Sequence, residues 1–400
     1  MVAAILQLQS TGIQDSFLTE NPQINIFKYK YFRYVNFATE LVKVPSDDIL
    51  DFGKNSSCTI PKNGHLLSKL YLRVKVPPLV KTSGTYLSWS ETLGYAMFKD
   101  GVDLEIGGIV VDTFYPGFWD IYESFEQPDN DLGANLLLLR GDTYVSSRFN
   151  ALKQNDLIIP LKFWFAREYK MSLPISAMHN QSIKVKFKFR DFQDCINYDG
   201  VAPVVDSHMT EADVYAEYIY LDDSVLPNLR DDKHEFLIEQ VRYNGPDFVP
   251  ANVGTHHSIL EFSNPCKELM FGCVQKTNIE KNNYFNYSNT DNDDTNIVSE
   301  ISLLLDGKAR FEFAPEVFYR LAYANAIHTS VPLKYVYSIP FCIHPQGNQP
   351  TGTLNLARFD NKDILMKMVP NNPECFVFIY GLMYNVITIE NGYLSFKFNI

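Results

Sequence analysis

The stretch "GVDLEIGGIVVDTF" at residues 101–114 decides the fold, because a related stretch recurs later in the chain. Each copy has an apolar run, a turn, a proline and a short aromatic-rich segment: "LEIGG" (104–108), Pro116 and "FWDIY" (118–122) in one, and "LLLDG" (303–307), Pro315 and "VFYRL" (317–321) in the other. Corresponding positions lie 199 residues apart, since 307 − 108 and 315 − 116 both give 199. Such self-similarity indicates that one structural unit is used twice.

Strand-forming runs dominate both copies. In "SIKVKFKF" (182–189) the apolar residues from Ile183 to Phe189 alternate with three lysines, which predicts a strand with one buried and one solvated face. Comparable runs occupy 65–76, 101–114, 157–166, 235–243, 334–343 and 374–389. Helical patterns are short, at about 116–126 and 315–326, and each opens with a proline. The sequence therefore predicts an all-β protein.

The length of 400 residues suits two domains of ordinary size. Two β domains of this length favour sandwiches over small barrels, and jelly roll is the leading topology. We therefore expect two tandem eight-stranded jelly rolls with a few short helices in loops. The predicted division is an N-terminal arm at 1–24, a first jelly roll at 25–222, a linker at 223–234 and a second jelly roll at 235–400, because the stretch around the linker is rich in charged and turn residues.

Charge and cysteine usage narrow the function. The formal net charge of −12 does not suit direct binding to nucleic acid, which needs a basic excess or patch. The six cysteines show no CxxC spacing, so we expect reduced thiols and a reducing compartment. The N-terminus lacks a basic region before its apolar run, and no apolar run approaches the ~18 residues of a bilayer span. We expect neither a secretory signal nor a transmembrane segment.

No motif for catalysis, metal binding or a cofactor stands out. None of the eight histidines is followed two residues later by His, Asp or Glu, as a cupin-type metal site would need. Only His257 and Glu261, four residues apart, partly match such a ligand pattern. The acidic run "DNDDTN" (291–296) lacks the central Gly and closing Glu of a calcium loop. The sequence has no nucleophile elbow or phosphate loop. We predict that the chain is not an enzyme and holds no metal or cofactor.

Two kinds of surface feature remain as candidates. Asn55, Asn180 and Asn286 each begin an N-x-S/T pattern and are candidate glycosylation sites. The segment 276–298 carries seven asparagines, a composition that predicts a long surface loop of the second domain. Such loops on a rigid sandwich are often where contact with other molecules occurs.

The stretch "FLTENPQINIFKYKYFRYVNFATE" (17–40) is unusually aromatic. From Ile24 to Phe37, rings fall on both faces of an extended chain, which we interpret as a long first strand whose rings mostly fill the first sandwich core. Before it, Pro22 keeps the backbone extended. Residues 1–24 are predicted to be an assembly arm, with contacts carried by Phe17, Leu18, Asn21, Pro22 and Gln23.

The same region carries a family resemblance. "QDSFLTENPQINIFKYKYFRYVNFATE" (14–40) resembles the N-terminal signature of the major capsid proteins of nucleocytoplasmic large DNA viruses, the double jelly-roll family of chlorella viruses and iridoviruses. Similar motifs follow in order over nearly the whole chain: "FGKNSSCTIPKNGHLL" (52–67), "DLEIGGIVVDTF" (103–114), "SLPISAM" (172–178), "AEYIYLD" (216–222), "HEFLIEQVRYNG" (234–245), "LLLDGKARF" (303–311), "IPFCIHPQGNQPTGTLNLARFDN" (339–361) and "YNVITIENGYLSF" (384–396).

The resemblance implies a structural viral capsid protein without enzymatic activity or cofactor. It implies a homotrimer of side-by-side jelly rolls, a pseudo-hexagonal capsomer that tiles the icosahedral shell of a large DNA virus. The implied partners are neighbouring capsomers and minor capsid proteins, without direct nucleic-acid contact and with only indirect contact to an inner membrane. The implied location is the virion, assembled in the host cytoplasm. Two alternatives stay open: a minor capsid paralogue, and a glycan-binding jelly-roll surface protein that uses the segment 276–298.

Overall fold

The protein is described by a computed structural model that covers residues 3–10, 12–23, 26–27, 31, 33–81, 84–127, 133, 137–140, 151–199, 207–231, 233–289 and 295–398. Two compact units are present, Met1–Phe37 and Ala38–Ile400. The first unit contains the short helices α1 (Ala3–Gln9) and α2 (Ile13–Thr19). Every described side chain between residues 4 and 36 is exposed. The second unit contains the sheets.

The first jelly roll consists of two four-stranded sheets with the strand orders β1-β10-β3-β7 and β2-β8-β5-β6. Its strands are β1 (Phe37–Val44), β2 (Asn55–Ile60), β3 (Leu66–Val76), β5 (Phe98–Ile106), β6 (Ile109–Phe114), β7 (Asn155–Pro160), β8 (Ile183–Phe189) and β10 (Glu211–Leu221). In β8 the apolar residues are buried and the lysines between them are partly exposed, as the alternation predicts. Beside this sandwich, β4 (Leu87–Trp89) pairs with β9 (Ile196–Tyr198).

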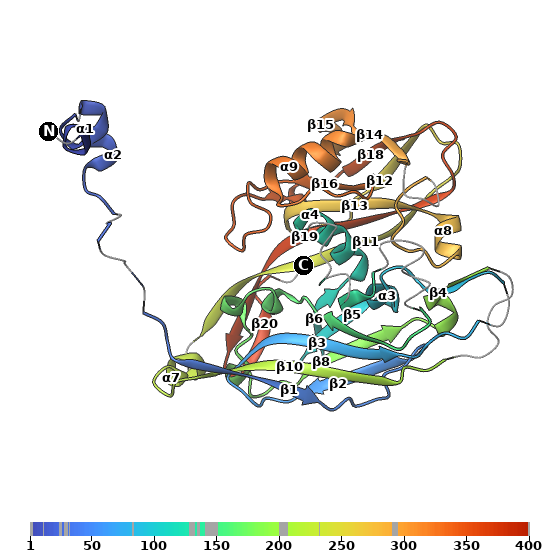
Figure 1. The fold of residues 1–400 in the computed structure, drawn as a ribbon, viewed down its shortest axis with the longest axis horizontal. Coiled ribbons are helices and arrows are strands. Elements are labelled where there is room, and N and C mark those ends of the chain that lie inside the picture. The colour runs from blue at the N-terminus through green and yellow to red at the C-terminus, as the bar shows by residue number, and fades with distance from the viewer. Residues whose placement is uncertain are drawn as a thin grey trace. The chain divides into compact units, whose positions relative to one another are not determined.

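The second jelly roll repeats this arrangement with the orders β11-β19-β13-β16 and β12-β18-β14-β15. Its strands are β11 (His234–Val249), β12 (Thr255–Ile259), β13 (Pro265–Gln275), β14 (Val298–Leu305), β15 (Lys308–Pro315), β16 (Val336–Pro340), β18 (Lys362–Met368) and β19 (Cys375–Glu390). Two short strands extend the first sheet, β17 (Leu354–Asn355) beside β13 and β20 (Tyr393–Phe396) beside β19. The described strands therefore form two tandem jelly rolls (Figure 1).

The repeat found in the sequence corresponds to one hairpin and one helix in each jelly roll. The hairpin β5–β6 turns at Gly107 and Gly108, and β14–β15 turns at Asp306 and Gly307, all with positive φ. Position 306 tolerates this conformation because aspartate is among the few residues with a side chain that visit it. The predicted all-β class with two eight-stranded jelly rolls is confirmed.

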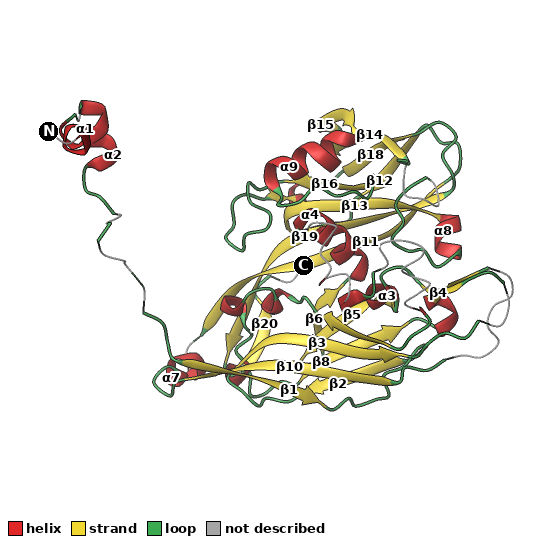
Figure 2. Ribbon diagram, viewed as in Figure 1, coloured by secondary structure: helices red, strands yellow, loops and turns green. Residues whose placement is uncertain are grey.

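Helices occupy the connections between strands (Figure 2). The longest described helix is α4 (Pro116–Glu126), which follows β6, and its counterpart after β15 is η5 (Phe318–Ala322) continued by α9 (Tyr323–Ile327). The remaining described helices are α3 (Leu93–Ala96), α7 (Leu226–Asp231), α8 (Lys276–Glu280), η1 (Trp164–Ala166), η2 (Tyr169–Met171), η3 (Ile175–Ala177), η4 (Phe192–Cys195) and η6 (Leu356–Arg358). Both predicted helical regions are thus present.

The predicted strand at 24–37 is wrong. None of its described residues before Phe37 is in a strand, and Phe27 and Tyr34 are 95% and 84% exposed. The described rings of this segment therefore do not fill the first core. The edge strand β1 itself buries only Val44. A segment with rings on both faces also offers no one-sided pattern that could dock on the sandwich.

Buried apolar residues form two clusters. The smaller lies inside the second sandwich, between its two sheets, and includes Leu269, Phe271 and Ile364. The larger fills the first sandwich and continues into the second jelly roll, where it includes Tyr380 and Phe285. We call this contact region between the two jelly rolls the seam. The two jelly rolls are therefore joined by a continuous apolar core.

Candidate functional site

Helix α4 of the first jelly roll contacts the second jelly roll, and it lies beside β13 (Figure 1). Phe118 and Trp119 in its first turn are 0% and 2% exposed. The Phe118 ring lies 6.0 Å from the ring of Tyr380 on β19. A Cβ atom at Gly117 would lie 2.3 Å from the Tyr380 hydroxyl oxygen, so the close approach of helix and sheet requires glycine there.

Two buried carboxylates on α4 are paired with cations. Glu123 accepts hydrogen bonds from the Tyr95 hydroxyl at 2.6 Å, Lys162 Nζ at 2.7 Å and Arg140 Nη2 at 2.7 Å. Burial alone would raise the pKa of Glu123, but the charges of Lys162 and Arg140 outweigh it and hold the pKa below its ordinary value. One turn earlier, Asp120 binds Lys334 of the second jelly roll at 3.0 Å. The helix therefore joins the jelly rolls by charge as well as by apolar contact.

The asparagine-rich segment 276–298 is a second part of the seam, and the prediction of a surface loop is wrong for most of its described residues. Asn282 Nδ2 donates to the carbonyl oxygens of Gln193 at 2.9 Å and Ile196 at 2.8 Å, both in the first jelly roll. The next ring, Tyr284, donates its hydroxyl to the Asp194 carbonyl at 3.1 Å. An asparagine amide can hydrogen-bond backbone groups, so this polar segment makes contacts between the two jelly rolls instead of facing solvent.

The outer faces of corresponding sheets differ in what covers them. In the second jelly roll, β13 is buried at every position from Cys266 onward, because its own sandwich covers one face and the first jelly roll covers the other. In the first jelly roll, β3 alternates between buried and half-buried residues along its length. The outward residues include Tyr71, which lies opposite Tyr215 of β10. This sheet, β1-β10-β3-β7, therefore has an uncovered outer face.

The helical region of the second jelly roll shows the complementary difference. By the 199-residue offset, Val317 and Phe318 correspond to Phe118 and Trp119 of α4. The two residues of the second copy are 47% and 50% exposed, whereas their counterparts are buried. Phe313 at the end of β15 adds a third apolar side chain, 39% exposed. We call Phe313, Val317 and Phe318 the free flank.

The predicted arm residues lie together in the first unit. Leu18 is in α2 and is 82% exposed, and Asn21, Pro22 and Gln23 follow in exposed non-helical chain. Phe17 also belongs to α2, but its side chain lies outside the described part of the structure. The arm's apolar side chains Ile5, Leu8 and Ile13 are likewise exposed. Their contacts with other chains stay a prediction.

The three candidate glycosylation sites differ in exposure. Asn55 opens β2 and is exposed, and Asn180 is exposed although its Nδ2 donates to the Asn391 carbonyl at 3.1 Å. Asn286 is 5% exposed, and its Oδ1 accepts from the backbone nitrogen and the hydroxyl of Ser288. A glycan needs its asparagine at the surface, so burial argues against Asn286, while Asn55 and Asn180 stay predictions.

Among the described residues, no three His, Cys, Asp or Glu side chains are grouped as ligands of a metal ion. The loop holding the acidic run 291–296 is mostly outside the described ranges. No helix in those ranges combines the length and hydropathy needed to cross a bilayer.

Sequence periodicity missed the free flank and the uncovered sheet. "VFYRL" has the same apolar character as "FWDIY", and apolar pattern alone predicts burial for both. The three-dimensional structure shows that one copy is covered and the other is exposed. The repeat was the signal that could have revealed this difference. The helix of the first copy packs on the jelly roll that follows it, but within the described strands no third jelly roll follows the helix of the second copy.

Comparisons with known proteins agree with this architecture. The sequence profile described as "Major capsid protein N-terminus" matches residues 25–222, and the profile described as "Large eukaryotic DNA virus major capsid protein" matches residues 228–395. The major capsid protein of Pyramimonas orientalis virus is 26% identical, with 98% of each chain covered. That of Paramecium bursaria Chlorella virus 1 is 26% identical over 90% of this chain and 86% of its own. The solved structure titled "PBCV-1 virus capsid, quasi-atomic model" shares the fold, with a TM-score of 0.82, 21% identity and coverage of 94% of this chain and 100% of its own.

Proposed function

The chain belongs to the family of large eukaryotic DNA virus major capsid proteins and has their structural role in the capsid, and we propose that three copies form a pseudo-hexagonal capsomer that tiles an icosahedral shell. One observation carries the proposal. Val317 and Phe318 are about half exposed in the single chain, while their counterparts Phe118 and Trp119 are buried against the neighbouring jelly roll. The free flank therefore has the character of an interface that a second copy would complete.

The repeat explains how such a contact closes. Within one chain, α4 of the first jelly roll covers the outer face of the β11-β19-β13-β16 sheet. A second copy can place the outer face of its β1-β10-β3-β7 sheet against the free flank of the first copy. This contact would repeat, between two chains, the contact that α4 makes with the second jelly roll within one chain. This contact joins unlike surfaces, so it generates a ring if the rotation closes. Three chains supply six jelly rolls, and each step around the ring then repeats a similar contact.

The receiving sheet has suitable chemistry for an interface. Its outer face presents the facing pair Tyr71 and Tyr215, with Ile158 of β7 40% exposed nearby on the same sheet. Charged pairs surround these side chains, including Arg73 with Asp156 at 2.6 Å. Aromatic residues within a polar rim are typical of protein interfaces. The rings supply contact area, and the ion pairs favour one register.

The first test is the mass of the purified protein. We expect light scattering at micromolar concentration to give about 138 kDa, three times the chain mass of 45.9 kDa. Permanent interfaces of this kind bury more than roughly 2,000 Å², which keeps the complex together on dilution. A mass of one chain under these conditions would refute the trimer. Negative-stain images add an independent check, since the particle should have a pseudo-hexagonal outline.

The arm is proposed to act in assembly between capsomers. Its described side chains are exposed, and it forms a compact unit separate from the jelly rolls. We expect deletion of residues 1–24 to leave the trimer mass and the thermal unfolding midpoint unchanged, but to reduce the yield of assembled shells severalfold. Light scattering and electron microscopy of co-expressed assemblies measure the two effects. If the deletion also dissolved the trimer, the division of roles between arm and jelly rolls would be wrong.

The capsomer lies in the virion shell, is assembled in the host cytoplasm, and contacts neighbouring capsomers and minor capsid proteins. Its negative net charge suits a layer that does not contact the genome directly. Any contact with an inner membrane is indirect. Its role is structural, and we propose no enzymatic activity or cofactor.

A further inference from the structure

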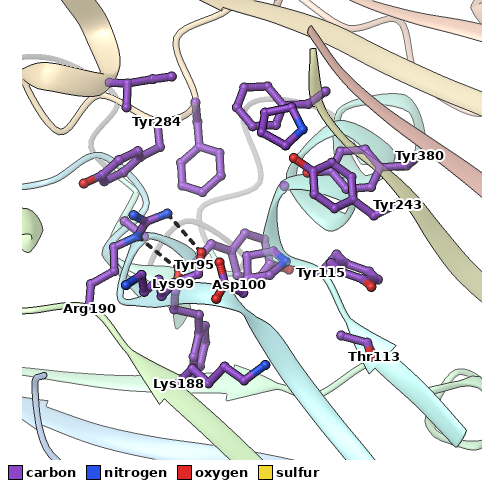
Figure 3. A pocket seen from close by; sticks show the side chains of 18 of the residues that line it. Tyr95, Lys99, Asp100, Thr113, Tyr115, Lys188, Arg190, Tyr243, Tyr284 and Tyr380 are labelled. Carbon is purple, nitrogen blue, oxygen red and sulfur yellow. Dashed lines mark hydrogen bonds between the residues drawn. The ribbon is translucent and has the colours of Figure 1, made fainter. Parts of the chain in front are cut away.

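A cavity of about 620 Å³ opens at the seam between the jelly rolls, within the size range of ligand pockets (Figure 3). Residues from both jelly rolls line it, including Tyr115 from the first and Tyr243 and Tyr380 from the second. Lys99 and Asp100 lie at its edge and are exposed, so the cavity can be reached from solvent. Assembly through the free flank does not use these residues.

One wall is a stripe of aromatic rings on the outer face of β11 and β19. Tyr243 faces Tyr380 across the two strands with ring centroids 4.9 Å apart and planes at 22°. Tyr243 also stacks on Phe378, 6.4 Å away and nearly parallel at 9°. The stripe continues to Phe376, which also lines the cavity, and beyond the cavity to Phe248, whose ring lies 5.3 Å from that of Phe376. The exposed fraction rises along it, from 6% at Tyr380 to 43% at Phe248.

The opposite wall is fixed in place before any ligand binds. The guanidinium of Arg190 lies 4.0 Å from the centroid of the Tyr284 ring. Arg190 is itself held by the carbonyl oxygens of Phe98 at 3.1 Å and Lys99 at 3.3 Å, as the dashed lines in Figure 3 show. A ligand would therefore meet preorganised rings on two sides, which lowers the entropic cost of binding.

Polar groups stand among these rings. The hydroxyl-bearing Tyr243 and Tyr380 line the cavity, and the charged residues Lys99 and Asp100 lie at its exposed edge. A purely apolar ligand would leave the hydroxyls that it covers without partners, which costs free energy. A simple anion fits poorly as well, since the aspartates Asp100 and Asp103 lie beside the cations that line the cavity.

We propose that this cavity and its aromatic stripe bind a carbohydrate. A pyranose ring has C–H faces that stack on aromatic rings and hydroxyls at its edge that both donate and accept hydrogen bonds. The cavity offers both kinds of contact: aromatic rings that line its walls, such as Phe376 and Phe378, and hydroxyl or charged partners such as Tyr243. The stripe leads from the cavity toward solvent, which suits a short neutral oligosaccharide rather than a single buried sugar.

Saturation-transfer NMR on the intact protein tests this proposal. The probes are glucose, galactose, mannose, N-acetylglucosamine and their short oligomers at about 10 mM, above the millimolar dissociation constants expected for weak sites. We expect at least one probe to receive saturation through its ring C–H protons. Absence of transfer to every probe would overturn the proposal. So would binding of an apolar dye at the stripe that no saccharide displaces.

Variants locate the binding. Tyr243→Ala removes both a ring that supports the stripe and a hydroxyl that lines the cavity, and it should weaken saccharide binding about tenfold. Tyr243→Phe removes only the hydroxyl and should weaken binding less. The matched control is Tyr393→Ala, which removes a tyrosine that is 53% exposed on β20, outside the cavity. Equal saccharide binding by Tyr243→Ala and the wild type would overturn the assignment. If Tyr243→Ala fails to fold, weaker binding by Tyr243→Phe with an unchanged unfolding midpoint supports the assignment, and unchanged binding overturns it.

Discussion

Replacement of Phe318 by aspartate is expected to convert the proposed trimer into single chains at micromolar concentration. The side chain is 50% exposed in the isolated chain, and its counterpart Trp119 is 2% exposed in the equivalent contact within the chain. In a trimer the substitution occurs at three interfaces. Each loses about 2 kcal/mol of apolar burial and must also remove a carboxylate from water. Since 1.4 kcal/mol is a tenfold change in an equilibrium constant, the sum is enough for dissociation.

The measurement is light scattering with an exposed apolar residue elsewhere as a control. Ile259→Asp makes the same kind of change at the end of β12, where the side chain is 66% exposed and the proposed contact does not reach. The control should remain a trimer. On the receiving sheet, Tyr215→Asp should act like Phe318→Asp, because it introduces charge on the other side of the same interface. A trimer that survives both substitutions would show that these surfaces do not meet.

The sequence was sufficient for the fold within each jelly roll. Alternation in "SIKVKFKF" placed the inward and outward residues of β8 correctly, because a strand at the surface of one sandwich has one dry and one wet face. The turn at Gly107 and Gly108 and the helix after Pro116 follow from equally local rules. These features depend on neighbours within a few residues, which a single sequence contains.

The seam could not be predicted in the same way. Asn282 and Tyr284 are polar or amphipathic residues in an asparagine-rich stretch, and local rules assign such a stretch to solvent. They are docked because carbonyl groups of residues 193–196, far away in the sequence, lie opposite them. The prediction that the rings before Phe37 are buried was wrong for the opposite reason. Their apolar pattern predicts burial, but the described rings of Phe27, Tyr31 and Tyr34 are exposed.

Replacement of Glu123 by glutamine is expected to lower the free energy of unfolding by about 3 to 5 kcal/mol at pH 7, because it leaves two partly buried cations without their counter-charge. The Glu123 side chain is 4% exposed, while Lys162 and Arg140 are 23% and 19% exposed. Glutamine keeps the size of the side chain but not its charge. The shift of the urea midpoint, multiplied by the wild-type slope, gives the change.

The matched control is Glu105→Gln. Glu105 pairs with Lys186, whose side chain is 45% exposed, so water screens this ion pair and its loss should cost less than about 1 kcal/mol. A similar cost at both positions would show that burial of the Glu123 carboxylate does not determine its contribution.

Acid provides a second test of the same charge. The pKa of Glu123 is held below its ordinary value in the folded chain, because the charges of Lys162 and Arg140 outweigh the effect of burial. A carboxyl with a lowered folded pKa stabilises the protein above its unfolded pKa of about 4.3, and that contribution is lost as the pH falls through the folded pKa. The difference between wild type and Glu123→Gln should therefore be full at pH 7 and shrink below about pH 4.3. A difference that stays constant down to the lowest pH at which both proteins fold would mean that shape, rather than charge, makes this residue matter.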